Sequence, residues 1–156
     1  MTENFDKRKM HLSSLLGEIN SNVGDRERRY FHLRTIENLI FHFEEIYPEV
    51  DKNWAYENLV EYFNICHEYI PSIDRGISIK LYNEYLDKVI DYYQNNLGFT
   101  VLLNRQIVYL IYLIILTLCY YFFNFYVVIA VATLFILHIL RMFRKYKAKQ
   151  VYGLFW

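Results

Sequence analysis

The sequence of 156 residues has no acidic side chain after Asp91 and no charged side chain of either sign from Ile107 to Leu140. A run of 34 residues without Asp, Glu, Lys or Arg is far longer than the apolar stretch of a core helix in a soluble protein. The absence of charge here predicts a membrane segment.

Several other features are scarce, and each scarcity excludes a class of protein. The two cysteines are too few for a disulfide framework, and Cys66 and Cys119 are expected in different environments, which fits a reducing compartment. The five glycines are scattered and form no phosphate-binding loop. Neither H-E-x-x-H nor C-x-x-C occurs, so we expect no metal site and no cofactor. The first 30 residues are charged throughout, so no signal peptide is predicted.

The uncharged run is long enough for two membrane spans. As one helix it would measure about 51 Å, whereas the hydrocarbon core of a bilayer is about 30 Å thick. One tilted span is less economical than two short spans, at about 107–123 and 125–140, with a turn at Asn124, the only amide in the run. The aromatic residues from Tyr120 to Tyr126 would lie at the far face of the bilayer. A hairpin that enters only one leaflet is the alternative.

The charges are segregated along the chain. Residues 106–156 carry five basic and no acidic side chains, whereas residues 1–105 carry 12 basic and 17 acidic ones, a net charge of −5. Basic residues next to a span favour the cytoplasmic side, so both termini are predicted to be cytoplasmic, at the inner or plasma membrane if the protein is bacterial. The residues expected to bind anionic head groups are Arg141, Arg144, Lys145, Lys147, Lys149 and Trp156.

The C-terminal tail, residues 142–156, combines these basic residues with aromatic ones. Such a composition suits a segment that lies on an anionic membrane surface. In the alternative interpretation, Tyr152–Trp156 docks into a groove of the helical domain or of a partner.

The first 100 residues predict a helical domain. Apolar side chains recur at helical spacing over 6–23, 26–47, 52–70 and 77–97, and Gly24, Pro48, Pro71 and Gly98 separate or end these stretches. We therefore predict an all-α protein. It would consist of a cytoplasmic bundle of about four helices (1–100), a transmembrane hairpin (101–141) and a basic aromatic tail (142–156).

One pattern offers a candidate for catalytic chemistry. Arg26 and His32 have a spacing that resembles the Arg–His motif of helical HEPN-type ribonucleases, a resemblance limited to seven residues. It would imply that the pair polarises a phosphate and moves a proton. A solvated basic turn, with Arg26, Arg28 and Arg29 paired to nearby acids, is the simpler interpretation. Contact with lipid head groups or phosphate is the alternative.

Three further side chains have reactive or ionisable groups. His138 lies within the second predicted span and is a possible intramembrane functional residue, although it can also reach the head groups. Cys66 and His67 are adjacent on a predicted helix and point about 100° apart, so they do not form a site and Cys66 is expected to be buried.

These observations predict a membrane-anchored, non-enzymatic helical interaction or adaptor protein. Its expected partners are a bilayer with anionic head groups and a protein partner or a second copy, and no nucleic acid is expected. One alternative is a small oligomeric membrane effector that perturbs the bilayer, of the toxin, defence or immunity type. The other is a membrane-tethered ribonuclease that uses Arg26 and His32.

Overall fold

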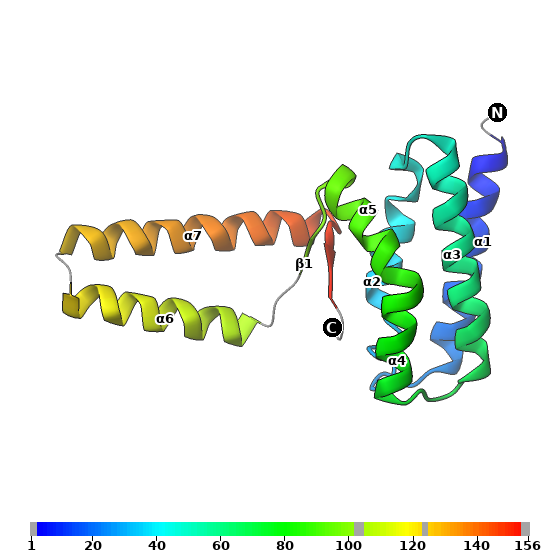
Figure 1. Ribbon diagram of the computed structural model, residues 1–156, viewed down its shortest axis with the longest axis horizontal. Helices are drawn as coiled ribbons and strands as arrows, with labels where there is room; N and C mark the ends of the chain where they lie inside the picture. The colour runs from blue at the N-terminus through cyan, green and yellow to red at the C-terminus, as the bar shows by residue number, and fades with distance from the viewer. Residues whose placement is uncertain (1–2, 102–104, 123–124, 154–156) are drawn as a thin grey trace. The chain divides into compact units, whose positions relative to one another are not determined.

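The computed structural model describes residues 3–101, 105–122 and 125–153. The chain forms two compact units. The first, called the helical domain, comprises Met1–Thr100 and Gln150–Trp156, and the second, called the two-helix unit, comprises Val101–Lys149. The chain is mostly helical, which confirms the all-α class (Figure 1).

In its described residues the helical domain contains five α-helices, one 3₁₀-helix and one π-helix. They are α1 (Glu3–Asn22), α2 (Leu33–Phe41), the 3₁₀-helix η1 (Phe43–Glu45), α3 (Glu49–Glu68), α4 (Arg75–Leu81), the π-helix η2 (Tyr82–Leu86) and α5 (Asp87–Leu97). α1 packs against both α2 and α3, and η2 packs against α3. Thr100–Val101 (β1) pairs with Val151–Tyr152 (β2), a short pairing that sequence periodicity did not predict.

Three of the four predicted helices lie where the apolar spacing placed them. The helix predicted over 77–97 is continuous from Arg75 to Leu97, although its middle part is π-helical. It begins at Asp74, whose carboxylate accepts a hydrogen bond of 2.7 Å from the N–H of Gly76. It ends at Gly98, which adopts a left-handed conformation with φ of 67°.

The second predicted helix, over 26–47, is wrong at both ends. Residues 25–32 form turns, and α2 begins only at Leu33. His32 is left-handed, with φ of 50°, and its ring Nε2 lies 3.0 Å from the hydroxyl of Ser78. This tertiary contact holds His32 in a conformation that interrupts a helix. At the other end α2 stops at Phe41, and η1 replaces the last predicted turn.

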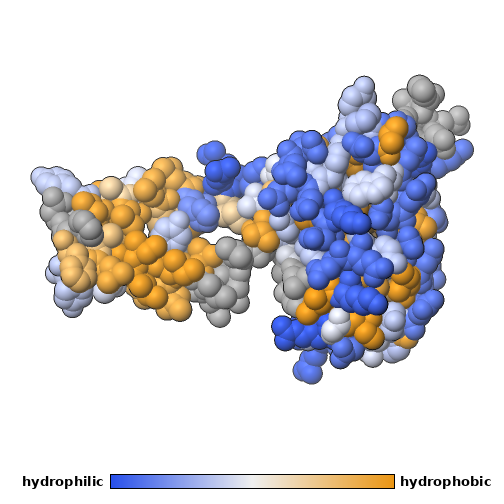
Figure 2. Space-filling view, viewed as in Figure 1, coloured by the Kyte–Doolittle hydropathy of each residue, from blue (hydrophilic) through white to orange (hydrophobic). Residues whose placement is uncertain are grey.

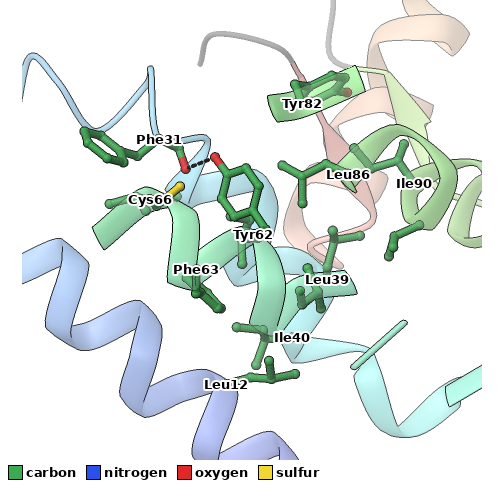
Figure 3. Packing of buried hydrophobic residues seen from close by; sticks show 14 of the residues in the cluster. Leu12, Phe31, Leu39, Ile40, Tyr62, Phe63, Cys66, Tyr82, Leu86 and Ile90 are labelled. Carbon is green, nitrogen blue, oxygen red and sulfur yellow. Dashed lines mark hydrogen bonds between the residues drawn. The ribbon is translucent and has the colours of Figure 1, made fainter. Parts of the chain in front are cut away.

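Large aromatic side chains are prominent in the core of the helical domain (Figure 3). Two buried tyrosine hydroxyls are bonded to backbone carbonyls. Tyr62 donates to the carbonyl of Phe31 at 3.0 Å, and Tyr93 donates to the carbonyl of Leu39 at 2.8 Å. Both tyrosines bury their rings. The Tyr62 hydrogen bond joins α3 to the segment before α2, and the Tyr93 hydrogen bond joins α5 to α2.

The two-helix unit consists of α6 (Arg105–Phe122) and α7 (Phe125–Lys147), which pack against each other. The rings of Tyr112 and Phe135 stack with centroids 4.1 Å apart. These residues are equally far from the connection between the helices, so α6 and α7 run antiparallel. Asn124, the predicted turn residue, lies outside the described residues. α7 continues beyond the predicted end at residue 140 because Lys and Arg favour helix and suit its C-terminal end.

The buried tyrosine hydroxyls allow a matched test of the core. We expect Tyr62→Phe to lower the free energy of unfolding by about 1–3 kcal/mol, because it leaves the buried carbonyl of Phe31 without this donor. Tyr92→Phe is the control, since the Tyr92 hydroxyl also bonds a backbone carbonyl, that of Tyr47, at an exposed site where water replaces it. Urea titration in detergent, followed by tryptophan fluorescence, compares the two variants. Equal losses would contradict the role assigned to the buried bond.

Candidate functional site

The two-helix unit exposes most of its large apolar side chains. No described side chain of α7 is buried. The side chains that are at least 50% exposed include those of Leu110, Leu113, Ile114, Leu118, Leu134, Ile136 and Leu137. Figure 2 shows a predominantly hydrophobic surface over these helices. An apolar surface of this extent on a protein marks an interaction with a membrane or another apolar partner.

α7 meets the requirements for crossing a bilayer by length and composition. It has 23 residues, and it is the one helix within residues 3–101, 105–122 and 125–153 that is long and apolar enough. At about 1.5 Å per residue it is about 35 Å long, compared with a hydrocarbon core of about 30 Å. The apolar stretch of α6, Leu110–Phe122, is shorter. The presence of one such helix is an indication of membrane association.

The ends of the two-helix unit differ in chemistry. Near the connection lie exposed aromatic side chains: Tyr120, Tyr121, Phe122, Phe125 and Tyr126. The predicted head-group ligands Arg141, Arg144, Lys145 and Lys147 lie in the last turns of α7. Lys147 places its Nζ 4.8 Å from the centre of the Phe143 ring. Lys149 follows the helix in a left-handed conformation, and Trp156 lies outside the described residues.

Polar side chains between these ends are bonded locally or lie against aromatic rings. The hydroxyls of Thr117 and Thr133 each donate to the carbonyl four residues earlier, at 2.8 and 2.9 Å. His138 is exposed, and its ring centre lies 5.9 Å from that of Tyr112 on α6. The predicted functional candidate His138 therefore neighbours the α6–α7 contact.

The chain returns from α7 to the helical domain through residues 150–153, called here the C-terminal segment. Asn38 on α2 donates from Nδ2 to the carbonyl of Val151 at 2.8 Å. Thr35, also on α2, donates from its hydroxyl to the carbonyl of Gly153 at 2.9 Å and accepts from the Gly153 N–H at 3.2 Å. Residues 150–153 are thus docked on the helical domain. For Tyr152 and Gly153 this agrees with the alternative interpretation, in which the end of the tail docks into the helical domain.

Further contacts join the C-terminal segment to α5 and to β1. The Tyr152 hydroxyl donates to Oε1 of Gln94 at 2.6 Å. The Thr100 N–H donates to the carbonyl of Gln150 at 3.1 Å. Val151 is buried, as is Gly153. The chain thus leaves the helical domain and re-enters it at hydrogen-bonded neighbours.

Sequence reasoning missed Thr35 and Asn38. Both lie on the buried face of α2 together with Leu39 and other apolar residues. The signal was available, since two polar side chains within an otherwise apolar helix face need a hydrogen-bond partner. The sequence alone could not identify that partner, because it lies more than 110 residues away.

The proposed Arg26–His32 pair does not lie on one helix. Both residues belong to the turns before α2, and Arg26 is exposed, whereas His32 is 2% exposed. The His32 ring is bonded to the hydroxyl of Ser78. Arg28 pairs with Asp25 at 3.0 Å, in line with the interpretation of this region as a basic turn with local ion pairs.

Cys66 is fully buried in the core, as its place on the predicted apolar face indicated. Desolvation raises the pKa of its thiol to about 12, and the hydrogen bond with Tyr62 lowers it by less. The neighbouring His67 lies on the same helix with its Nε2 3.8 Å from a carboxylate oxygen of Glu18 on α1. Within the described residues no three His, Cys, Asp or Glu side chains are grouped to hold a metal ion.

Comparisons of the chain with known protein families, with curated proteins and with solved structures yield no match.

The buried thiol predicts a loss of stability at alkaline pH. Below the ordinary pKa of 9.0 the thiol is protonated in both folded and unfolded chains, so it does not make stability depend on pH. From pH 9 towards 12 the unfolded chain loses this proton and the folded chain keeps it. The free energy of unfolding should then fall by up to about 1.4 kcal/mol per pH unit more in the wild type than in Cys66→Ala. Urea titrations from pH 8 to 10.5 measure this difference, and parallel curves would refute it.

Proposed function

We propose that the protein is a membrane-anchored, non-enzymatic interaction protein, in which the two-helix unit inserts into a bilayer and the helical domain binds a protein partner in the aqueous phase. The observation that carries the proposal is the surface of α6 and α7. Their large apolar side chains are exposed, and no charge interrupts the sequence from residue 107 to residue 140.

The energetics of this surface favour a membrane. Full burial of one Leu, Ile or Phe side chain from water is favourable by about 1.5–3 kcal/mol. Leu113 on α6 and Leu134 and Ile136 on α7 are each more than half exposed, and several other apolar side chains of these helices resemble them. Burial of the exposed parts of even a few of these side chains supplies several kcal/mol, which is enough to hold the unit in lipid.

The docked C-terminal segment constrains how the chain can cross. Thr100 and Gln150 are joined by a hydrogen bond, and both belong to the helical domain. With this pairing in place, a membrane-inserted two-helix unit would begin and end on the same side of the membrane, and its number of crossings would be even. If α7 crosses, α6 crosses as well. With 18 residues α6 is about 27 Å long, close to the thickness of about 30 Å that it must span.

Charge and aromatic residues support one orientation. The basic residues at the end of α7 favour the cytoplasmic side, where anionic lipids attract them by about 1 kcal/mol each. The exposed aromatic side chains Tyr121 and Tyr126, near the connection, suit the opposite interface. The helical domain and both termini would then be cytoplasmic.

Exposed apolar side chains of the segment from Phe41 to Val50, called here the exposed patch, support partner binding by the helical domain. Phe41, Tyr47 and Val50 lie within ten residues of one another, and each is more than half exposed. Two acidic residues of the same segment form ion pairs with α1, Glu49 with Arg8 and Glu44 with Lys9. Apolar side chains with a polar rim are typical of a protein-binding surface.

Arginines placed in one helix at a time test insertion and the paired crossing. We expect Ile111→Arg/Ile114→Arg in α6 and Leu134→Arg/Leu137→Arg in α7 to move most of the chain out of the membrane fraction. Each arginine costs about 2.5–3.5 kcal/mol at the centre of a span, and neither helix can cross alone. Alkaline extraction and flotation of membranes from an expression host measure the partition.

The control is Met10→Arg/Val50→Arg, which adds the same charge at exposed apolar sites of the helical domain and should leave the partition unchanged. If the α6 variant stays as resistant to extraction as the wild type, two crossings are excluded. If the α6 variant and the α7 variant both stay as resistant to extraction as the wild type, insertion of the two-helix unit is excluded.

The exposed patch is tested separately. The experiment cross-links the chain in membranes, purifies it and measures how much of the partner protein is recovered with it. We expect Phe41→Glu/Val50→Glu to reduce this recovery at least tenfold, because carboxylates disfavour an apolar contact. Asn20→Glu/Asn64→Glu adds the same charge at exposed polar positions of α1 and α3. Equal recovery with both pairs would remove the patch as the binding surface. Growth arrest with oligomers and no partner would favour the membrane effector instead.

A further inference from the structure

The C-terminal segment is held mainly by side chains that bind its backbone. Thr35 bonds both the carbonyl and the N–H of Gly153, and Asn38 bonds the carbonyl of Val151. The Thr100 N–H bonds the carbonyl of Gln150, as one strand bonds its neighbour. Recognition through main-chain hydrogen bonds, with pockets for alternate side chains, is how many domains bind an extended peptide.

The two α2 side chains are unusual for a helix core. Thr35 is 1% exposed and Asn38 is 5% exposed, and their neighbours on the same face are apolar. A buried hydroxyl or amide is costly unless it is hydrogen-bonded, so apolar residues would suit these positions better if they only had to fill a core. Their presence is explained by the peptide backbone that they bind.

The segment also shows a pattern that defines what fits. Val151 is 1% exposed and Gly153 is buried, whereas Tyr152 between them is half-buried with its hydroxyl on Gln94. This alternation is that of an extended strand lying on a surface. The pattern is a buried β-branched residue, one outward residue that can donate a hydrogen bond, and glycine.

We propose that Thr35 and Asn38 of α2, Gln94 of α5 and Thr100 form a peptide-binding surface, and that the chain's own residues 150–153 occupy it as a displaceable ligand. The kind of partner that fits is a protein segment with the same extended Val-x-Gly pattern. Every residue of this surface belongs to the helical domain, so the proposal holds whether or not the two-helix unit inserts into a membrane.

Attachment to the chain keeps the segment bound. Three side-chain hydrogen bonds to backbone and one buried valine give a free peptide only modest affinity. Tethering raises the effective concentration of the segment to about the millimolar range, so it outcompetes a dilute partner. Binding of a partner would therefore release the end of α7 from the helical domain.

The test uses the full-length chain in detergent with Val151→Asp, which we expect to empty the surface because it places a carboxylate at a buried position, while every residue of α2 and α5 is kept. The probe is a fluorescein-labelled peptide with the sequence of residues 148–156, followed by anisotropy. We expect saturable binding to Val151→Asp, with at least tenfold weaker binding to the wild type, whose surface is occupied. Adding Asn38→Ala to Val151→Asp should weaken binding at least tenfold.

Two controls separate recognition from adhesion to micelles. Asn64→Ala, at an exposed position of α3, should not change binding in the Val151→Asp background. A peptide that itself carries aspartate in place of valine at position 151 should not bind. Binding of both peptides alike, or no saturable binding to a Val151→Asp chain that melts as the wild type does, overturns the proposal.

A chain ending at Lys149 replaces Val151→Asp if that variant does not fold, and the same outcomes apply to it. If both variants unfold and the added peptide does not restore their thermal transition, the segment is an integral part of the core and the proposal fails. Arginine substitutions in α6 and α7 should leave peptide binding unchanged. A failure of membrane insertion can therefore be distinguished from a failure of peptide binding.

Discussion

The hydrogen bond between Thr100 and Gln150 is the constraint on which the arrangement of the chain depends. It joins the last residue of the helical domain before the two-helix unit to the first residue after it. While residues 150–153 are docked, the 49 residues between them are closed into a loop. A closed loop cannot cross a bilayer an odd number of times while the domain at its base stays in water. Under this condition, if α7 crosses the bilayer, α6 crosses as well, although the apolar stretch of α6 alone is too short to qualify as a span.

The two units use the same kinds of side chains for different surroundings. In the helical domain aromatic residues such as Tyr62 and Tyr93 are buried, and their hydroxyls bond backbone carbonyls within the core. In the two-helix unit Tyr120 and Tyr121 are about three-quarters exposed and lie near the connection. Tyrosine suits both positions because its ring is apolar and its hydroxyl needs a polar partner, which is a carbonyl in the core and would be water or a head group at an interface.

Sequence reasoning succeeded where local pattern decides the structure. Apolar spacing placed α1, α3 and the helix from Arg75 to Leu97 within a few residues, and the absence of charge identified α6 and α7. It failed at His32, whose left-handed backbone depends on Ser78, 46 residues away. It left the tail undecided, because the partners of residues 150–153 are side chains of α2 and α5. Periodicity reports which face of a helix is buried, but it does not report what covers that face.

The buried face of α2 contacts both the apolar core and the backbone of residues 150–153, and the two contacts require different side chains. One part of its buried face packs in the core through Ile36 and Leu39, which are fully buried, and requires only apolar shape. The part with Thr35 and Asn38 meets a backbone and requires hydrogen-bonding groups. The hydrogen bonds of Thr35 and Asn38 to the backbone of residues 150–153 lower the cost of undocking, because water can replace each lost hydrogen bond once the segment leaves. Apolar side chains at these positions would form no hydrogen bonds with water after the segment leaves. The composition of α2 therefore favours a segment that can be exchanged for another over one that is permanently built into the fold.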